Sequence, residues 1–287
     1  MTVAVLLGLL VVFAGGLGTM VLLTRHYRVP RVPHRRTPEM YGIGFEELRF
    51  ATGGGKQLYG WWIPAGTRPG PAVILVHGWG RNLERMLPFI RPLHGAGFHL
   101  LAFDARCHGS SDPDGHATMV TFSEDIRAAV RVAASRPEVD PARLSVLGLS
   151  VGGAAAIHAA AHEPTLRAVV TVGAFAHPGD AMSWELRGRG VPGPLIRLVL
   201  RWVERRVGFS LEDEAPERKI VHAKAPILLV HGEEDEVVPP EHGTRLARAG
   251  GDGVRLLLLP GRGHSDCNRD PRFWPEVLAW LGRPHAR

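Results

Sequence analysis

The sequence contains little cysteine. Only Cys107 and Cys267 occur among its 287 residues, too few for a disulfide framework, and no Cys/His group has the spacing of a zinc site. Hydrophobic residues make up 45% and charged residues 22%, and there is no low-complexity tract, which excludes a disordered or collagen-like chain. A chain of this length can bury a sizeable core without disulfide bonds, so we expect a globular protein.

Acidic side chains are missing from the first 38 residues. This segment holds five arginines, which account for all but one of the six net positive charges: Arg25, Arg28, Arg31, Arg35 and Arg36. A nucleic-acid-binding protein presents a broad basic face, whereas here the excess charge is confined to one segment. We therefore expect no nucleic-acid partner.

Charge of either sign is absent from residues 2–24. As a helix this run reaches about 34 Å, enough for a hydrocarbon core of about 30 Å. The alternative is a cleaved signal peptide, but that needs basic residues before a shorter apolar run. We therefore predict a retained single-pass membrane anchor over residues 1–24.

The arginines that follow this run predict its orientation. All five lie after it and none before it, so the positive-inside rule places the rest of the chain in the cytoplasm. Residues 25–39 contain three prolines and are predicted to form an extended, basic juxtamembrane linker. Its arginines could touch anionic lipid, although fixing the topology is a sufficient role for them.

Residues 40–287 alternate short apolar runs with helix-like stretches. Unbroken Val/Ile/Leu runs are typical of strands buried on both faces of a parallel sheet, whereas the first two runs are more mixed and suit an antiparallel edge. This alternation predicts an α/β fold built from βαβ units. The expected strands are Phe45–Ala51, Leu58–Ile63, Ala72–Val76, Leu100–Asp104, Leu144–Leu149, Ala168–Val172, Ile227–Val230 and Val254–Leu259.

Helices are expected over residues 122–135, 151–162, 239–249 and 271–282. Thr121 and Glu124 have the spacing of a capping box at the start of the first, and Pro271 suits the first turn of the last. Residues 174–225 break the alternation, because they contain an amphipathic helix, 194–207, instead of a buried strand. Its expected apolar side consists of Leu195, Leu198, Val199 and Trp202.

A G-x-S-x-G motif lies between an expected strand and an expected helix. Gly148, Ser150 and Gly152 form it, and a nucleophile on such a sharp turn needs small neighbours. The helix that follows offers N–H groups near the serine. A tight structural turn is the alternative interpretation, but this context favours Ser150 as a catalytic nucleophile.

A serine nucleophile needs a base and an acid that orients the base. His264 lies in a Gly-rich loop directly after the last strand, and Asp235 follows the preceding strand. The order Ser150, Asp235, His264 is that of the nucleophile-elbow hydrolases. Three other acids of the same loop are fallback partners for the histidine: Glu233, Glu234 and Glu236.

Acyl transfer also needs N–H donors directed at the developing oxyanion. The segment 77–80, His-Gly-Trp-Gly, follows the third strand, and its glycines allow the backbone to turn inward. We expect the N–H groups of Trp79 and Val151 to form the oxyanion hole. The Trp79 side chain could bind substrate or serve only as a packing aromatic.

Together these motifs resemble the α/β-hydrolase superfamily over roughly residues 40–285. The matching pieces are H-G-W-G at 77–80, F-D-A-R-C-H-G-S-S at 103–111, G-L-S-V-G-G at 148–153, G-E-E-D-E-V-V-P at 232–239 and G-R-G-H at 261–264. The sequence looks most like the bacterial serine-hydrolase branch, which has lysophospholipase-like, aminopeptidase-like and esterase-like members. Cys107 departs from the pattern, because related loops more often carry glycine there.

The resemblance implies a mostly parallel eight-stranded sheet, a helical cap (174–225) after the sixth strand, a Ser150/Asp235/His264 triad, and neither metal nor organic cofactor. We expect a carboxylic-ester hydrolase acting on a small-molecule or lipid-like acyl substrate. Insertion arginines such as Arg187 and Arg189 could face lipid headgroups or be merely solvated. Two alternatives stay open: a peptidase or amidase with the same triad, and a non-catalytic binding or scaffold protein. The sequence does not indicate an oligomeric state.

Overall fold

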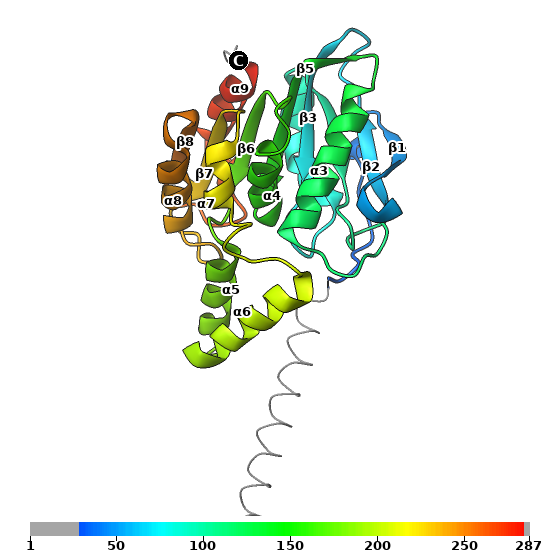
Figure 1. Cartoon of the computed structure of the whole chain (residues 1–287). Coiled ribbons are helices and arrows are strands. Elements are labelled where there is room, and N and C mark those ends of the chain that lie inside the picture. Colours follow the sequence, from blue (N-terminus) through cyan, green and yellow to red (C-terminus); the bar gives the residue numbers. More distant parts are fainter. Residues whose placement is uncertain (1–28, 284–287) are drawn as a thin grey trace, which may run out of the picture. The chain divides into compact units, whose positions relative to one another are not determined.

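The computed structural model describes residues 29–283. One eight-stranded sheet lies at its centre, in the order β1-β2-β4-β3-β5-β6-β7-β8 (Figure 1). β1 and β2 are antiparallel to their neighbours, and the strands from β4 onward along this order run parallel, as expected. The strands are β1 (Glu46–Ala51), β2 (Gln57–Ile63), β3 (Gly70–Val76), β4 (His99–Phe103), β5 (Val139–Leu149), β6 (Ala168–Val172), β7 (Ile227–Gly232) and β8 (Val254–Leu259).

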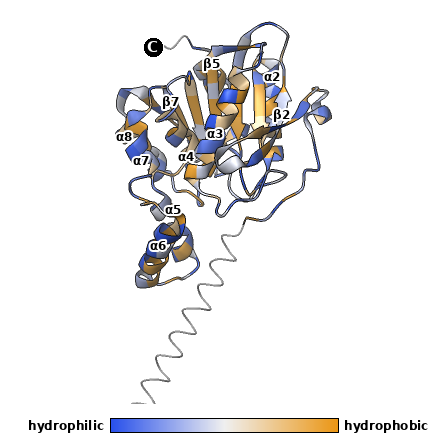
Figure 2. Ribbon diagram, turned by 45° about the vertical axis from the view of Figure 1, so that its right-hand side comes forward, coloured by the Kyte–Doolittle hydropathy of each residue, from blue (hydrophilic) through white to orange (hydrophobic). Residues whose placement is uncertain are grey.

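Helices cover both faces of the sheet, and each face has its own apolar core. Period-two alternation along β3 sends Ile74 and Val76 towards α3, α4 and α8, and Val73 and Leu75 towards α2 and α9. Figure 2 shows hydrophobic residues concentrated on the strands. The helices are α2 (Leu87–Gly95), α3 (Met119–Ala134), α4 (Val151–Ala160), α5 (Pro178–Gly188), α6 (Gly193–Val207), α7 (Pro216–Lys219), α8 (Glu241–Gly250) and α9 (Phe273–Gly282). Short 3-10 turns are η1 (Pro38–Tyr41), η2 (Gly53–Gly55), η3 (Leu83–Met86), η4 (Ile220–His222), η5 (Gly251–Gly253) and η6 (Cys267–Arg269).

Two expected helix starts were wrong. α3 begins at Met119, and its N-cap is Thr118, whose hydroxyl accepts the Thr121 N–H at 3.0 Å. Thr121 completes that capping box from the N3 position, while Glu124 accepts a hydrogen bond from Arg106 instead. α9 begins at Phe273, so Pro271 precedes its first turn.

The insertion between β6 and β7 contains α5, α6, α7 and η4, and Figure 1 shows α5 and α6 together beyond one end of the strands. The expected apolar side of α6 was rotated from the observed one. α6 buries Ile196 and Val199, whereas Leu198 is 59% exposed. α6 packs against α5, and the hydrophobic pattern alone did not resolve which side it would bury.

Residues 25–39 were predicted to form a linker, and the compact unit begins within them, at Arg31. The Asn82 side-chain amide donates to Val32 O at 3.0 Å, Arg36 Nε donates to Glu84 at 2.6 Å, and His34 Nε2 lies 2.9 Å from Asp104. Residues 31–36 therefore pack on the rest of this compact unit. Within residues 29–283 no helix has both the length and the apolar character that a membrane span requires. The anchor predicted over residues 1–24 lies outside the described residues.

Candidate active site

Ser150 lies at the sharp turn between β5 and α4. Its φ of +54° is in the left-handed region, which non-glycine residues adopt rarely and mostly where the surrounding structure enforces it. The Ser150 N–H donates to Val172 O at 2.8 Å, and α4 starts at the next residue. β3 and β5 are neighbours, yet the chain leaves them towards opposite edges of the sheet. Ser150 thus lies at the topological switch point, where α/β proteins bind ligands.

The glycines around Ser150 are required by close backbone contacts. A Cβ on Gly148 would lie 2.3 Å from Gly152 O, and one on Gly152 would lie 2.5 Å from His77 O. A Cβ on Gly153 would lie 2.9 Å from Gly148 O. Any larger side chain would push the strand, the helix and the 77–80 turn apart, so the motif predicted from sequence has a direct steric cause.

Asp235 and His264 meet across the loops that follow β7 and β8. His264 Nδ1 lies 2.7 Å from Asp235 Oδ2, and the Asp235 side chain is fully buried. Because a carboxylate can only accept, Nδ1 carries the proton and donates it, which leaves Nε2 of a neutral imidazole free to act as a base. The three fallback glutamates, Glu233, Glu234 and Glu236, are exposed.

Several donors hold the Asp235 carboxylate in its charged form. Oδ1 accepts the N–H groups of Val237 at 3.0 Å and Val238 at 2.8 Å, while His231 Nε2 lies 3.3 Å from Oδ2. Burial opposes ionisation, but the hydrogen bonds from His231 and His264 outweigh it and hold the pKa of Asp235 well below its usual range. The acid is therefore charged throughout the neutral pH range, as an orienting partner must be.

Ser150 and His264 belong to the same end of the sheet. Ser150 is hydrogen-bonded to Val172, and the next residue, Gly173, lies directly against the His264 ring: a Cβ there would be 3.0 Å from Nδ1. Among the residues described, Ser150 Oγ and His264 make no direct hydrogen bond, and such contacts often tighten only when substrate binds. Gly173 was not identified from the sequence. A glycine directly after the sixth strand could have indicated a position where the chain turns close to another group.

The 77–80 turn lies against Ser150. A Cβ on Gly78 would be 3.4 Å from Ser150 Cβ, and Trp79 is 36% exposed. The Gly80 N–H donates to His108 Nε2 at 3.1 Å, so His108 Nδ1–H donates to Arg106 O. Burial lowers the pKa of His108 to about 3, which keeps it neutral and able to accept. α4 begins at Val151, so the N–H groups of its first turn have no intrahelical acceptor.

Cys107, like Ser150, has a positive φ, but the groups around its side chain differ. Its φ is +67°, which explains why a glycine suits this position. Its thiol donates to Asp114 O at 3.4 Å, and burial raises the thiol pKa, so it is a structural group rather than a nucleophile. Asp104 accepts the N–H groups of Leu83 at 2.7 Å and Ser110 at 2.8 Å and thus stabilises the same loop.

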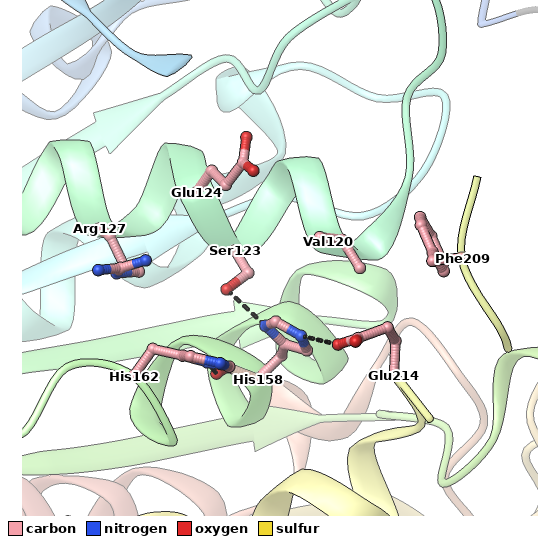
Figure 3. Close-up of a pocket in the computed structure, with 8 residues that line it drawn as sticks. All are labelled: Val120, Ser123, Glu124, Arg127, His158, His162, Phe209 and Glu214. Carbon is pink, nitrogen blue, oxygen red and sulfur yellow. Dashed lines mark hydrogen bonds and ion pairs between the residues drawn. The ribbon is translucent and has the colours of Figure 1, made fainter. Parts of the chain in front are cut away.

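A second serine, histidine and carboxylate meet between α3 and α4 (Figure 3). Ser123 Oγ lies 2.9 Å from His158 Nδ1, and His158 Nε2 lies 2.7 Å from Glu214. They border a cavity of about 270 Å³, whose described lining includes neither Ser150 nor His264. The lining residues are Val120, Ser123, Glu124, Arg127, His158, His162, Phe209 and Glu214.

Three arginines flank the loop that carries His264. Arg85 Nη2 donates to Ser265 O at 2.9 Å, and Arg81 and Arg269 are exposed nearby. Burial, and after it the charges of Arg81 and Arg269, lower the pKa of Arg85. We call Arg81, Arg85 and Arg269 the arginine rim. Between residues 29 and 283, no group of three or more His, Cys, Asp or Glu side chains could hold a metal ion.

Known proteins share this architecture. The family model described as "Serine aminopeptidase, S33" matches residues 67–214, a range that includes Ser150 but ends before Asp235 and His264. An uncharacterised protein of Mycobacterium tuberculosis is 31% identical over 222 residues, 74% of this chain and 69% of its own length. A monoacylglycerol lipase of Mycolicibacterium smegmatis is 28% identical over 267 residues, covering 80% and 94% of the two chains.

Solved structures agree on the fold. An esterase of Pyrococcus furiosus superposes with a TM-score of 0.72 at 23% identity, covering 88% of this chain and 97% of the other. Family membership sets aside the non-catalytic alternative and leaves an ester or peptide hydrolase. The chain belongs to the S33 serine aminopeptidase family of the α/β-hydrolase superfamily, and it is a serine hydrolase.

Proposed function

We propose that this hydrolase cleaves carboxylic esters through an acyl-enzyme on Ser150. The observation that carries the proposal is the strained Ser150 turn beside the buried Asp235–His264 pair. Ser150 Oγ attacks the acyl carbonyl while His264 Nε2 accepts its proton. Asp235 holds the His264 tautomer, and the N–H groups of Trp79 and Val151 donate to the oxyanion. His264 then protonates the leaving alcohol and afterwards activates the water that releases the acid.

An ester fits this site better than an aminoacyl peptide does. An aminopeptidase must bind a free α-ammonium group, and the guanidinium of Arg85, whose Nη2 donates to Ser265 O at 2.9 Å, puts positive charge against the His264 loop. Like charges in a partly desolvated site repel strongly. The family description and the monoacylglycerol lipase relative leave both chemistries open, so the charge of Arg85 is the discriminating feature.

The proposed acyl group is lipid-like. Trp184 of α5 and Leu198 of α6 are 48% and 59% exposed, and Trp184 Nε1 donates to Glu236 O at 2.9 Å, beside Asp235. The Trp184 side chain of the 174–225 insertion thus reaches the acid loop, which supports a role for the insertion as a cap over the acyl chain. The relative that is a monoacylglycerol lipase supports the same substrate class.

The proposal includes membrane attachment. The charge-free run 2–24 and the arginines after it support a single-pass anchor with the catalytic unit on the cytoplasmic side. Fractionation of the full chain and of a chain lacking residues 1–24 tests this. We expect only the full chain to sediment with membranes, and recovery of both in the soluble fraction would contradict the anchor.

The chemical proposal is tested with matched chromogenic substrates. An ester series of increasing acyl length and an aminoacyl amide series are compared on the wild type and on Ser150→Ala. We expect ester hydrolysis that requires Ser150 and rises with chain length, with little amide cleavage. Preference for the aminoacyl amides would favour the peptidase alternative instead.

A further inference from the structure

Residues 31–36 are bonded to the chain shortly after β3. The Asn82 side-chain amide donates to Val32 O at 3.0 Å, and Arg36 Nε donates to Glu84 at 2.6 Å. Asn82 is also the N-cap of η3, because its side chain accepts the Glu84 N–H at 3.1 Å. The segment before β1 is therefore tied to the beginning of η3 by two hydrogen bonds.

The same segment also contacts the loop that follows β4. His34 Nε2 lies 2.9 Å from Asp104 Oδ2, and the Asp104 side chain is fully buried. The His34 ring stacks on Tyr59, with 5.1 Å between the ring centroids. Burial opposes protonation of His34, but the Asp104 carboxylate outweighs it and raises the pKa of His34 above its ordinary value. The charged imidazolium that pairs with the carboxylate is thus favoured.

Asp104 connects His34 to both of these places. Its Oδ1 accepts the Leu83 N–H at 2.7 Å, at the start of η3, and its Oδ2 accepts the Ser110 N–H at 2.8 Å in the loop after β4. A fully buried carboxylate that loses its ion pair is costly. Without His34, Asp104 and the two backbone segments bonded to it would therefore have to shift.

The loop after β4 holds the turn that carries Trp79. The His77 ring accepts the Ala105 N–H through Nε2 at 3.1 Å, and the Gly80 N–H donates to His108 Nε2 at 3.1 Å. The turn is thus bonded to this loop on both sides of Trp79. Because a backbone donor stabilises an oxyanion only when it is directed accurately at it, a shift of the loop would weaken the donor.

Given the acyl transfer proposed above, we propose that His34 is a positioning residue of the oxyanion hole. It acts through Asp104, which fixes the loop after β4, and that loop directs the Trp79 N–H at the substrate oxygen where negative charge develops. His34 takes no part in the proton transfers, which run between Ser150, His264 and the substrate. The segment that precedes the first strand is therefore a part of the catalytic machinery rather than a spacer.

The test compares full-length variants with the wild type on nitrophenyl octanoate. His34→Leu removes the group that pairs with Asp104, whereas His34→Gln keeps an N–H donor. We expect His34→Leu to lower kcat by about tenfold at unchanged KM, less than the loss of about 10²- to 10³-fold that follows removal of a whole oxyanion donor. His34→Gln should restore most of kcat. Equal losses in both variants would contradict the role of the Asp104 pair.

His94→Leu is the matched control. His94 Nε2 lies 3.1 Å from Pro64 O, so this variant also removes a histidine contact between two segments. Pro64 follows β2, where Ile63 pairs with Leu100 near the start of β4, whereas the Trp79 turn follows β3, which runs parallel to β4. The control contact thus lies at the other end of the sheet, and its kcat should be unchanged. A similar loss of kcat in the control would overturn the assignment.

An octyl trifluoromethyl ketone gives a second readout, because its adduct with Ser150 carries an oxyanion. We expect His34→Leu to raise the Ki of this inhibitor by about the factor by which it lowers kcat. A lower kcat at unchanged Ki would indicate a smaller folded fraction and would refute the positioning role. An unchanged kcat would also refute it, while leaving ester hydrolysis established.

The wild type separates this inference from the proposed function. If it hydrolyses the ester in a Ser150-dependent way, the His34 variants decide the positioning role alone. If it does not, the proposed function is refuted, and this inference with it.

Discussion

Two regions of this protein bring a serine, a histidine and a carboxylate together, and they differ in almost everything else. Ser150, His264 and Asp235 come from loops at the ends of parallel strands. Ser123 and His158 come from the interior turns of α3 and α4, and Glu214 comes from the segment after α6. The residue types are nearly the same, so their arrangement must decide which set is reactive.

Backbone strain and ring orientation separate the two sets. Ser150 sits on a left-handed turn and is partly exposed, whereas Ser123 is 2% exposed on a helix. Asp235 binds Nδ1 of His264, which leaves Nε2 free; Glu214 binds Nε2 of His158, which turns Nδ1 towards Ser123. The Ser123 set satisfies buried polar groups, while the Ser150 set leaves a base and a hydroxyl available.

Replacing the two serines should give the largest contrast. Ser150→Ala is expected to lower kcat for ester hydrolysis by about 10⁴-fold or more, because the nucleophile is lost. Ser123→Ala should leave kcat unchanged and only weaken the fold. Steady-state kinetics of both purified variants measure this, and a large loss of kcat in Ser123→Ala would break the distinction.

The two carboxylates should differ next. Asp235→Asn is expected to lower kcat by about 10⁴-fold, since the amide favours the wrong His264 tautomer. Glu214→Gln should preserve kcat and cost about 1–2 kcal/mol of unfolding free energy, because its partners His158 and Lys219 lose a charged acceptor. Kinetics and urea unfolding of the two variants separate these effects. Equal kcat for wild type and Asp235→Asn would remove Asp235 from the mechanism.

Glycines of the elbow should be less tolerant than glycines elsewhere. A Cβ on Gly148 would collide with Gly152 O, so Gly148→Ala is expected to cost about 3 kcal/mol of unfolding free energy. Gly188 of α5 has open space around it and serves as the control. Gly188→Ala should be neutral or slightly stabilising. Urea unfolding curves compare them, and an unperturbed Gly148→Ala would show that the elbow is not tightly packed.

The last prediction concerns pH, and its effect is small when measured over a single pH unit. His108 has a pKa of about 3 in the folded protein and about 6.5 when unfolded, so only the unfolded chain gains a proton as pH falls below 6.5. Its contribution to stability is therefore present above pH 6.5 and lost on acidification, at about 1.4 kcal/mol per pH unit. Denaturation at several pH values should show a shallower acid slope in His108→Gln. An unchanged slope would mean that His108 does not titrate as described.

Sequence patterns predicted the eight strands and identified Ser150, Asp235 and His264 as catalytic candidates. They could do so because buried strands and strained glycine turns follow from local constraints. They failed where tertiary contacts decide. The rotation of α6 is an example, since this helix packs against α5. The start of α3 was missed for a local reason, because the Thr118/Thr121 capping box was not recognised. The packing of residues 31–36, the role of Gly173 and the arginine rim required distant segments to meet, which no spacing in the sequence encodes.

The central claim is that Ser150, and not Ser123, is the nucleophile. Treating the native protein with a fluorophosphonate probe and mapping the modified peptide by mass spectrometry tests it most directly. We expect one adduct, on Ser150, and none after Asp235 or His264 is replaced. An adduct on Ser123, or an unreactive Ser150 in an enzyme that still hydrolyses esters, would contradict the account.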